Sequence, residues 1–170
     1  LMEEELVRVH HEAGATTLYI THDQREAMAL ASRVAVMQAG RFEQIAPPEE
    51  VHDRPASEVV ARFIGRAAVV SGVVEGGRVR IGPLVADAVR PVEDRAPVRA
   101  VVRPADVRLG DGAGHGASLG RVTSAAYRGG AWEGRVAIEG VDEALPVTAP
   151  TRLRPGERVP VSLRPVWTLP

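Results

Sequence analysis

The sequence predicts an α+β protein whose helices come first and are followed by an all-β part. Over residues 1–65, apolar side chains recur at helical spacing around short β-branched runs, whereas from about Arg66 no helical stretch remains. Short valine-rich strands then alternate with glycine-rich and Pro-Gly turns, a pattern typical of a small barrel or sandwich. We therefore expect two domains, residues 1–65 and residues 66–170.

The first domain is predicted to open with an amphipathic helix, because apolar residues recur at helical spacing from Met2 to Ala13. The β-branched and aromatic run Thr16–Thr21 then predicts a buried strand. A second helix is expected from about Asp23 to Ser32, since Thr21 followed by Gln24 matches a capping box.

The remaining elements follow from their turn and capping residues. The first domain should continue with strands Val34–Met37 and Phe42–Ala46, a short helix opened by Pro47-Pro48 and a helix from Ser57 to Gly65. The strands expected in the second domain are Val69–Glu75, Arg78–Ile81, Leu84–Val89, Val98–Val102, Ser118–Tyr127, Trp132–Ile138, Ala144–Val147 and Val159–Leu163, with a surface loop over Gly110–Gly120.

Composition excludes several kinds of chemistry. The chain has no cysteine, which rules out disulfides, thiolate metal sites and a cysteine nucleophile. All 21 basic residues are arginine, so neither a P-loop lysine nor a lysine Schiff base is available within this chain. The formal net charge of -1 indicates no nucleic-acid partner. No apolar run approaches the about 20 residues that span a bilayer, and we expect a cytoplasmic location.

One histidine has the position of a functional residue. His22 follows the predicted strand Thr16–Thr21 and precedes the predicted helix. Ligands of open α/β sheets gather at the carboxyl ends of strands, and a helix N-terminus there favours anions. A histidine at this point can donate a hydrogen bond to a phosphate oxygen. The alternative is that His22 is a loop residue or a helix cap without chemistry.

The residues around His22 carry a family resemblance. The stretch Thr16–Arg41 closely resembles the switch-histidine region of ABC-transporter ATPases, in the importer subgroup typified by maltose, polyamine, sulfate and ferric-iron uptake. The likeness is dense over residues 4–65 and looser over residues 66–170. It continues through Glu43-Gln44-Ile45, Pro48-Glu49-Glu50, Arg54-Pro55-Ala56 and residues 60–65, and Val102–Val107 resembles the Arg-Pro-acid segment of a C-terminal TOBE domain.

The resemblance implies a fold and a site. Residues 1–65 are expected to be the C-terminal remnant of a P-loop α/β nucleotide-binding domain, and residues 66–170 a TOBE-type, OB-like regulatory β-barrel. His22 becomes the switch histidine that contacts the ATP γ-phosphate. Its motif neighbours are Thr21, Asp23 and Gln24, with Asp23 near a dimer interface. The P-loop, Q-loop, signature segment and Walker B carboxylates would precede Leu1.

The function implied is that of an ATP-binding and ATP-hydrolysing subunit of an ABC importer, which couples hydrolysis to solute uptake through a membrane permease. ATP and Mg²⁺ are expected as cofactors of the parent protein, and permease subunits and a second copy of the chain as its partners. The subunit would lie at the inner face of the cell membrane. This chain alone is expected to be inactive and to bind no cofactor or metal. The alternative is a non-catalytic regulatory, dimerisation or oxyanion-binding module.

Other candidate residues have simpler interpretations. His10 and His11 point about 100° apart on a helix, so they do not share a face as metal ligands. Tyr127 and Trp132 flank a Gly-Gly turn, where cross-strand core packing is favoured over base stacking. Five arginines of the second domain could form an oxyanion pocket, although outward strand positions are the default interpretation: Arg78, Arg80, Arg99, Arg103 and Arg108.

Overall fold

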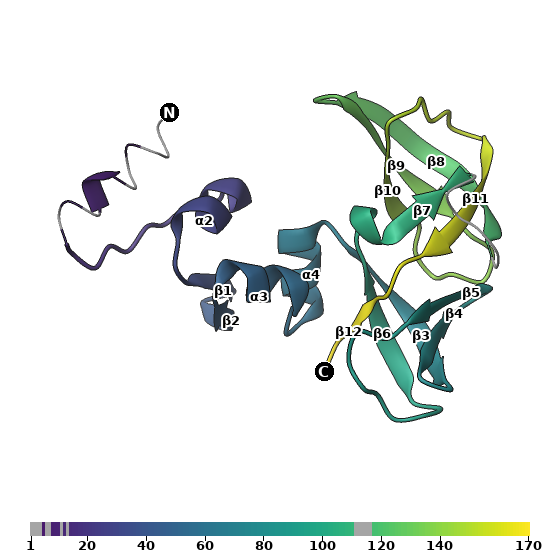
Figure 1. The fold of residues 1–170 in the computed structure, drawn as a ribbon, viewed down its shortest axis with the longest axis horizontal. Helices are drawn as coiled ribbons and strands as arrows, with labels where there is room; N and C mark the ends of the chain where they lie inside the picture. The colour runs from purple at the N-terminus through teal and green to yellow at the C-terminus, as the bar shows by residue number, and fades with distance from the viewer. Residues whose placement is uncertain (1–4, 6–7, 11, 13, 111–116) are drawn as a thin grey trace. The chain divides into compact units, whose positions relative to one another are not determined.

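The computed structural model describes residues 5, 8–10, 12, 14–110 and 117–170 (Figure 1). The chain divides into two compact units, Leu1–Val60 and Ala61–Pro170, and the division falls inside a helix. Over the described part of the chain, no helix is long and apolar enough to cross a membrane.

The first unit is built from short elements. Its helices are α2 (Gln24–Leu30), α3 (Pro48–Asp53) and the start of α4 (Glu58–Gly65), and strands β1 (Val34–Gln38) and β2 (Arg41–Ala46) form an antiparallel hairpin. These elements confirm the helices and strands predicted after residue 22. Of the helix predicted over residues 2–13, residues 5, 8–10 and 12 are helical and the others lie outside the described residues.

The predicted strand Thr16–Thr21 is wrong. Residues 15–21 have no regular secondary structure, and the side chains of Leu18 and Ile20 are each 87% exposed. A strand exists through hydrogen bonds to a neighbouring strand, and the only sheet in the described residues of this unit is the β1–β2 hairpin. The β-branched composition alone therefore did not produce a strand.

The predicted cap of the second helix is also wrong by two residues. The N-cap of α2 is Asp23, whose side-chain Oδ1 accepts a hydrogen bond from the backbone N–H of Arg25 at 2.8 Å. Thr21 lies two residues earlier, and its hydroxyl oxygen accepts a hydrogen bond from the backbone N–H of Asp23 at 3.0 Å. A carboxylate is as good a cap as a hydroxyl, and here the residue nearer the helix takes the role.

The second unit contains two five-stranded sheets, which lie one above the other at the right of Figure 1. The order is β12-β6-β3-β4-β5 in one sheet and β10-β9-β8-β11-β7 in the other. The strands are β3 (Ala68–Glu75), β4 (Arg78–Ile81), β5 (Leu84–Asp87), β6 (Pro97–Val102), β7 (Val107–Leu109), β8 (Ser118–Arg128), β9 (Ala131–Ala137), β10 (Leu145–Ala149), β11 (Arg158–Leu163) and β12 (Trp167–Thr168).

One hydrophobic core joins the inward faces of both sheets. Val70 and Ile81 from one sheet and Val136 and Val161 from the other are all fully buried in the same cluster. Buried and exposed residues alternate in β4 and β5. This period-two burial is typical of strands with one buried face. The eight strands expected from the sequence are confirmed, with ends shifted by only a few residues.

Sequence reasoning missed three short elements and misplaced a loop. The missed elements are β7, β12 and the 3-10 turn η1 (Pro104–Asp106). In η1, Asp106 accepts the backbone N–H of Arg103 at 2.9 Å, which gives the Arg-Pro-acid segment a structural role. The loop expected over Gly110–Gly120 ends earlier, because residues 118–120 already belong to β8, while residues 111–116 lie outside the described residues.

Candidate functional site

His22 lies in the bend between the irregular residues 15–21 and α2, with its side chain exposed. Both of its neighbours are held by short-range hydrogen bonds, through the Thr21 hydroxyl and the Asp23 carboxylate. Gln24, the third motif neighbour, is the half-buried first residue of α2. The result is an exposed imidazole on a backbone that is fixed on both sides.

Glu26, in the first turn of α2, forms hydrogen bonds with residues that precede His22. Its Oε2 accepts the Thr21 hydroxyl at 2.8 Å and the Tyr19 hydroxyl at 3.0 Å. The hydrogen bond to this carboxylate raises the pKa of Tyr19, because ionising the phenol would place a second negative charge beside Glu26. Sequence reasoning missed Tyr19 and Glu26, and the only available signal was an acidic residue in the first turn of a helix.

Histidines elsewhere in the described residues do not form a metal centre. No group of three or more histidines, aspartates or glutamates in this part of the chain is placed to hold a metal ion. His10 contacts the hydroxyl of Thr17 at 3.0 Å, while its sequence neighbour His11 lies outside the described residues. The chemistry open to His22 is therefore that of a single imidazole, which can donate or accept one hydrogen bond at each ring nitrogen.

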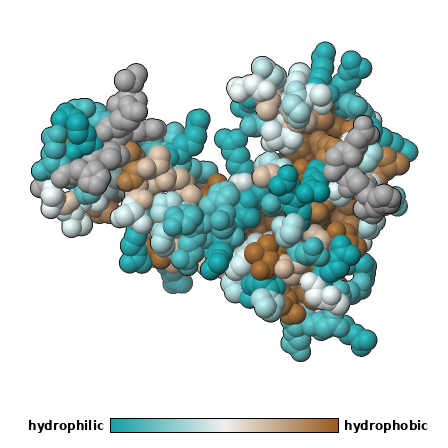
Figure 2. Space-filling view, in the orientation of Figure 1, coloured by the Kyte–Doolittle hydropathy of each residue, from teal (hydrophilic) through white to brown (hydrophobic). Residues whose placement is uncertain are grey.

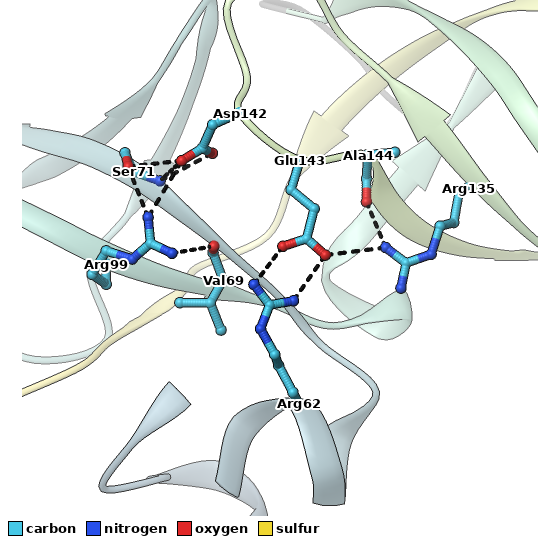
Figure 3. Close-up of polar contacts among 8 residues, drawn as sticks. All are labelled: Arg62, Val69, Ser71, Arg99, Arg135, Asp142, Glu143 and Ala144. Atoms are coloured by element: carbon cyan, nitrogen blue, oxygen red, sulfur yellow. Dashed lines mark hydrogen bonds and ion pairs between the residues drawn. The ribbon is translucent and has the colours of Figure 1, made fainter. Parts of the chain in front are cut away.

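The second unit, Ala61–Pro170, is called the β-unit from here on. It holds a polar cluster around Asp142 and Glu143, consecutive residues of the β9–β10 connection (Figure 3). Asp142 accepts the Ser71 hydroxyl at 2.8 Å, the Ser71 backbone N–H at 3.2 Å and the Arg99 guanidinium at 3.3 Å. Partial burial acts to raise the pKa of Asp142. The bonds from Ser71 and the charge of Arg99 outweigh it, so this pKa lies below its ordinary value.

Glu143 is the centre of the second half of this cluster. Arg62, in α4, donates to both carboxylate oxygens at 2.8 and 2.6 Å, and Arg135, in β9, donates to one of them at 3.3 Å. Arg135 also donates to the carbonyl of Ala144 at 2.9 Å. The hydrogen bonds from Arg62 lower the pKa of Glu143, against a smaller opposing effect of burial. The C-terminal part of α4 is thereby held to the β9–β10 connection.

The five arginines considered as an oxyanion pocket are not gathered in one place. Arg78 pairs with Asp87 at 3.1 Å and Arg80 with Glu75 at 2.7 Å, both on the exposed surface. Arg103 is buried beside η1. Only Arg99 among the five lines the groove of about 410 Å³ that runs beside β3 and β6.

The structure confirms only part of the core packing predicted for Tyr127 and Trp132. Tyr127 and Trp132 are cross-strand partners with ring centroids 5.8 Å apart. Trp132 packs against the core, but Tyr127 is 62% exposed, so the expectation that both rings are core residues is wrong. The long β8–β9 hairpin extends beyond the core at this end, and the guanidinium of Arg152 lies 5.5 Å from the Trp132 ring centroid.

Comparison with known proteins first identifies the class of domain present in the β-unit. Residues 100–169 match the model of the TOBE domain family, which covers most of the strands of the β-unit. The β-unit of this chain therefore contains a match to the TOBE domain over residues 100–169.

Whole-chain relatives then define the family. The chain is 34% identical over 165 residues to the sulfate/thiosulfate import ATP-binding protein CysA of Brucella melitensis, covering 96% of this chain and 46% of that protein. It is 36% identical over 139 residues to the spermidine/putrescine import ATP-binding protein PotA of Rubrobacter xylanophilus, covering 75% and 36%. The chain belongs to the family of ABC importer ATP-binding subunits, as a C-terminal portion of one.

A third relative, the CysA protein of Caulobacter vibrioides, is 46% identical over 108 residues, which cover 64% of this chain and 31% of that protein. The chain thus spans less than half the length of these curated relatives.

Proposed function

We propose that the protein to which this chain belongs hydrolyses ATP to drive solute uptake through a membrane permease, and that His22 is its switch histidine. The observation that carries the proposal is the exposed imidazole of His22, set between the hydrogen-bonded residues Thr21 and Asp23 in a segment that resembles the switch region of importer ATPases.

In this mechanism His22 donates a hydrogen bond to an oxygen of the ATP γ-phosphate while negative charge develops there. A fixed donor aimed at developing charge lowers the barrier because it needs no reorganisation at the moment of reaction. Thr21 and Asp23 act as positioning residues, since their hydrogen bonds fix the backbone on either side of the imidazole. Neutral imidazole suffices for this role, so the histidine need not be protonated.

The other parts of the reaction are assigned to the whole subunit. ATP and Mg²⁺ are its cofactors, and a P-loop lysine and Walker B carboxylates outside these 170 residues bind the phosphates and activate water. We propose that two copies enclose the nucleotides and that the assembly docks on permease subunits at the inner face of the membrane. By itself this chain is proposed to be inactive, because it has no lysine for a P-loop.

The proposed domains are the nucleotide-binding portion, residues 1–65, and the TOBE domain, residues 66–170, with a regulatory role for the second. The names of the relatives cover both oxyanions, sulfate and molybdate, and cationic polyamines, so the proposal extends to import and not to one solute. The test is ATP turnover measured beside nucleotide affinity for the full-length subunit and its His22→Ala variant, with His52→Ala as a control.

A further inference from the structure

Glu26 makes contacts that an acid which only stabilises a helix would not make. It is the third residue of α2, the position from which a carboxylate in a capping box accepts the backbone N–H of the N-cap residue. Here the N–H of the N-cap Asp23 donates to the Thr21 hydroxyl oxygen instead, at 3.0 Å. The Oε2 atom of Glu26 accepts two side-chain hydroxyls, from Thr21 at 2.8 Å and from Tyr19 at 3.0 Å. Glu26 therefore connects the segment before His22 to the helix after it.

These hydrogen bonds form a continuous chain across His22. The Thr21 hydroxyl donates its proton to Glu26, and its oxygen accepts the Asp23 N–H. The Asp23 carboxylate in turn accepts the backbone N–H of Arg25 at 2.8 Å. A hydroxyl has one proton, so a carboxylate that accepts this proton turns the lone pairs of the oxygen towards the Asp23 N–H. A charged acceptor gives a strong bond, and each bond in such a chain polarises the next.

Burial differs along this chain of hydrogen bonds. Thr21 and Glu26 are half-buried, whereas His22 is exposed. The bond between the Thr21 hydroxyl and the Glu26 carboxylate is therefore partly shielded from water, while the imidazole stays accessible. Residues 15–21 have no partner strand among the described residues, so these side-chain bonds connect Tyr19 and Thr21 to α2.

We propose that Glu26 is a positioning residue for His22: by holding the Thr21 hydroxyl, its carboxylate fixes the backbone that presents the imidazole to the γ-phosphate. The proposal rests on the switch role proposed for His22 and adds the group that sets its geometry. Glu26 acts through Thr21, since no hydrogen bond joins Glu26 to His22 in the part of the chain that the structure describes. The competing explanation is that Glu26 only stabilises α2 by its negative charge in the first turn.

The two explanations differ in what a neutral amide does at this position. In the full-length subunit, Glu26→Ala should lower kcat about tenfold and change KM by less than about twofold, because a displaced donor loses transition-state stabilisation and not ground-state binding. Glu26→Gln keeps an oxygen acceptor for Thr21, so its kcat should fall by less than about threefold. Equal losses in the two variants, which follow from the lost charge alone, overturn the positioning role. Unchanged turnover in Glu26→Ala overturns it as well.

Glu49 supplies the matched control. It is exposed in the first turn of α3, and it forms no hydrogen bond or ion pair with any residue that the structure describes. Glu49 therefore shares the charge and the helix position of Glu26 but not its contacts. Glu49→Ala should leave kcat and KM unchanged. A loss of turnover as large as that of Glu26→Ala would show that a charge at a helix terminus is sufficient, and would overturn the proposal.

A double-mutant cycle tests whether Glu26 acts through His22. A positioning residue has no effect once the group that it positions is gone, so the two losses should not add. In the His22→Ala background, Glu26→Ala should change the remaining kcat by less than about twofold. A further loss of about tenfold in that background would show that Glu26 acts by another route, and would overturn the proposal.

Amide hydrogen exchange, measured by NMR on the 170-residue chain without ATP, separates this proposal from the switch role of His22. The Asp23 amide should exchange at least about threefold faster in Glu26→Ala and in Thr21→Val, because its acceptor is released in the first variant and absent in the second. Unchanged Asp23 exchange in Glu26→Ala overturns the positioning role, whatever the turnover of His22→Ala. Faster exchange together with normal turnover in both Glu26→Ala and His22→Ala overturns instead the switch role on which the proposal rests.

Discussion

Arg62 and Glu143 form a two-pronged ion pair across 81 positions of sequence, with N–O distances of 2.8 and 2.6 Å. Arg62 comes from the last turns of α4 and Glu143 from the β9–β10 connection. The pair therefore links the last turn of α4 to the β9–β10 connection, and its loss has measurable consequences.

Glu143→Gln should lower the free energy of unfolding of the β-unit by about 1 kcal/mol, because two arginines lose their charged acceptor at a partly buried position. Urea denaturation followed by tryptophan fluorescence measures this change. The control is Glu75→Gln, whose carboxylate pairs with Arg80 on the exposed surface, and this substitution should lower stability less than Glu143→Gln does. Equal losses of stability in the two variants would show that the paired geometry at Glu143 contributes no additional stability.

Stability should depend on pH through the same acids. The pKa values of Asp142 and Glu143 are lowered in the folded state, so each contributes stability above its unfolded-state pKa of about 4. That contribution is lost as the pH falls through the folded-state values. The urea midpoint should drop between about pH 5 and pH 3, and the drop should be smaller in Glu143→Gln. If the urea midpoint falls with pH by the same amount in the unsubstituted chain and in Glu143→Gln, Glu143 does not contribute to the pH dependence of stability.

His22→Ala in the full-length subunit should lower kcat and kcat/KM together by roughly 10²–10³-fold, with ATP affinity nearly unchanged. The reason is that a hydrogen bond made mainly in the transition state contributes little to ground-state binding. Steady-state turnover and nucleotide titration provide the two measurements. His52→Ala, at a half-buried histidine of α3 that pairs with Asp53, should behave as the unsubstituted protein. Near-normal turnover, or a loss of binding as large as the loss of turnover, would exclude the switch role.

Gly120→Ala should destabilise the β-unit by about 1–3 kcal/mol, since a buried methyl group there has no room. A Cβ at this position would meet the Val136 Cγ1 at 2.3 Å, with Ile138 and Val161 also within 3.1 Å. Ala126→Val, on an exposed position of the same strand, is the control and should change stability little. Thermal unfolding of both variants checks the prediction, and a stable Gly120→Ala protein would show that β8 can shift.

The isolated chain should self-associate through the first unit. Leu18, Ile20, Met37 and Phe42 are between 57% and 87% exposed there, and exposed apolar patches of this kind drive association. Figure 2 shows hydrophobic residues on the surface of both units. Leu18→Ser with Ile20→Ser should lower the mass found by light scattering at high concentration, whereas Leu119→Ser on the β-unit should not. A monomeric unsubstituted chain would refute this expectation.

Most strands of the β-unit were predictable from the sequence because the pattern that predicts each strand lies within its own residues. Val79 and Ile81 alternate with Arg78 and Arg80, and such alternation specifies a half-buried strand without knowledge of its partner. By contrast, β7 and β12 have three and two residues, too few for a pattern, and they are strands only because β11 and β6 lie beside them. Trp167 and Thr168 could not be assigned before the pairing with β6 was known.

For the candidate site, the sequence by itself determined that His22 stands in a switch-like motif and that this chain carries no P-loop lysine, since both follow from residue identity and order. Only the tertiary structure showed that Thr16–Thr21 has no partner strand among the described residues, that Glu26 accepts hydrogen bonds from Thr21 and Tyr19, and that Arg62 pairs with Glu143. The physical reason is the range of the interactions. Periodicity and capping act over a few residues, whereas strand pairing, ion pairs and grooves depend on which distant segments the fold brings together.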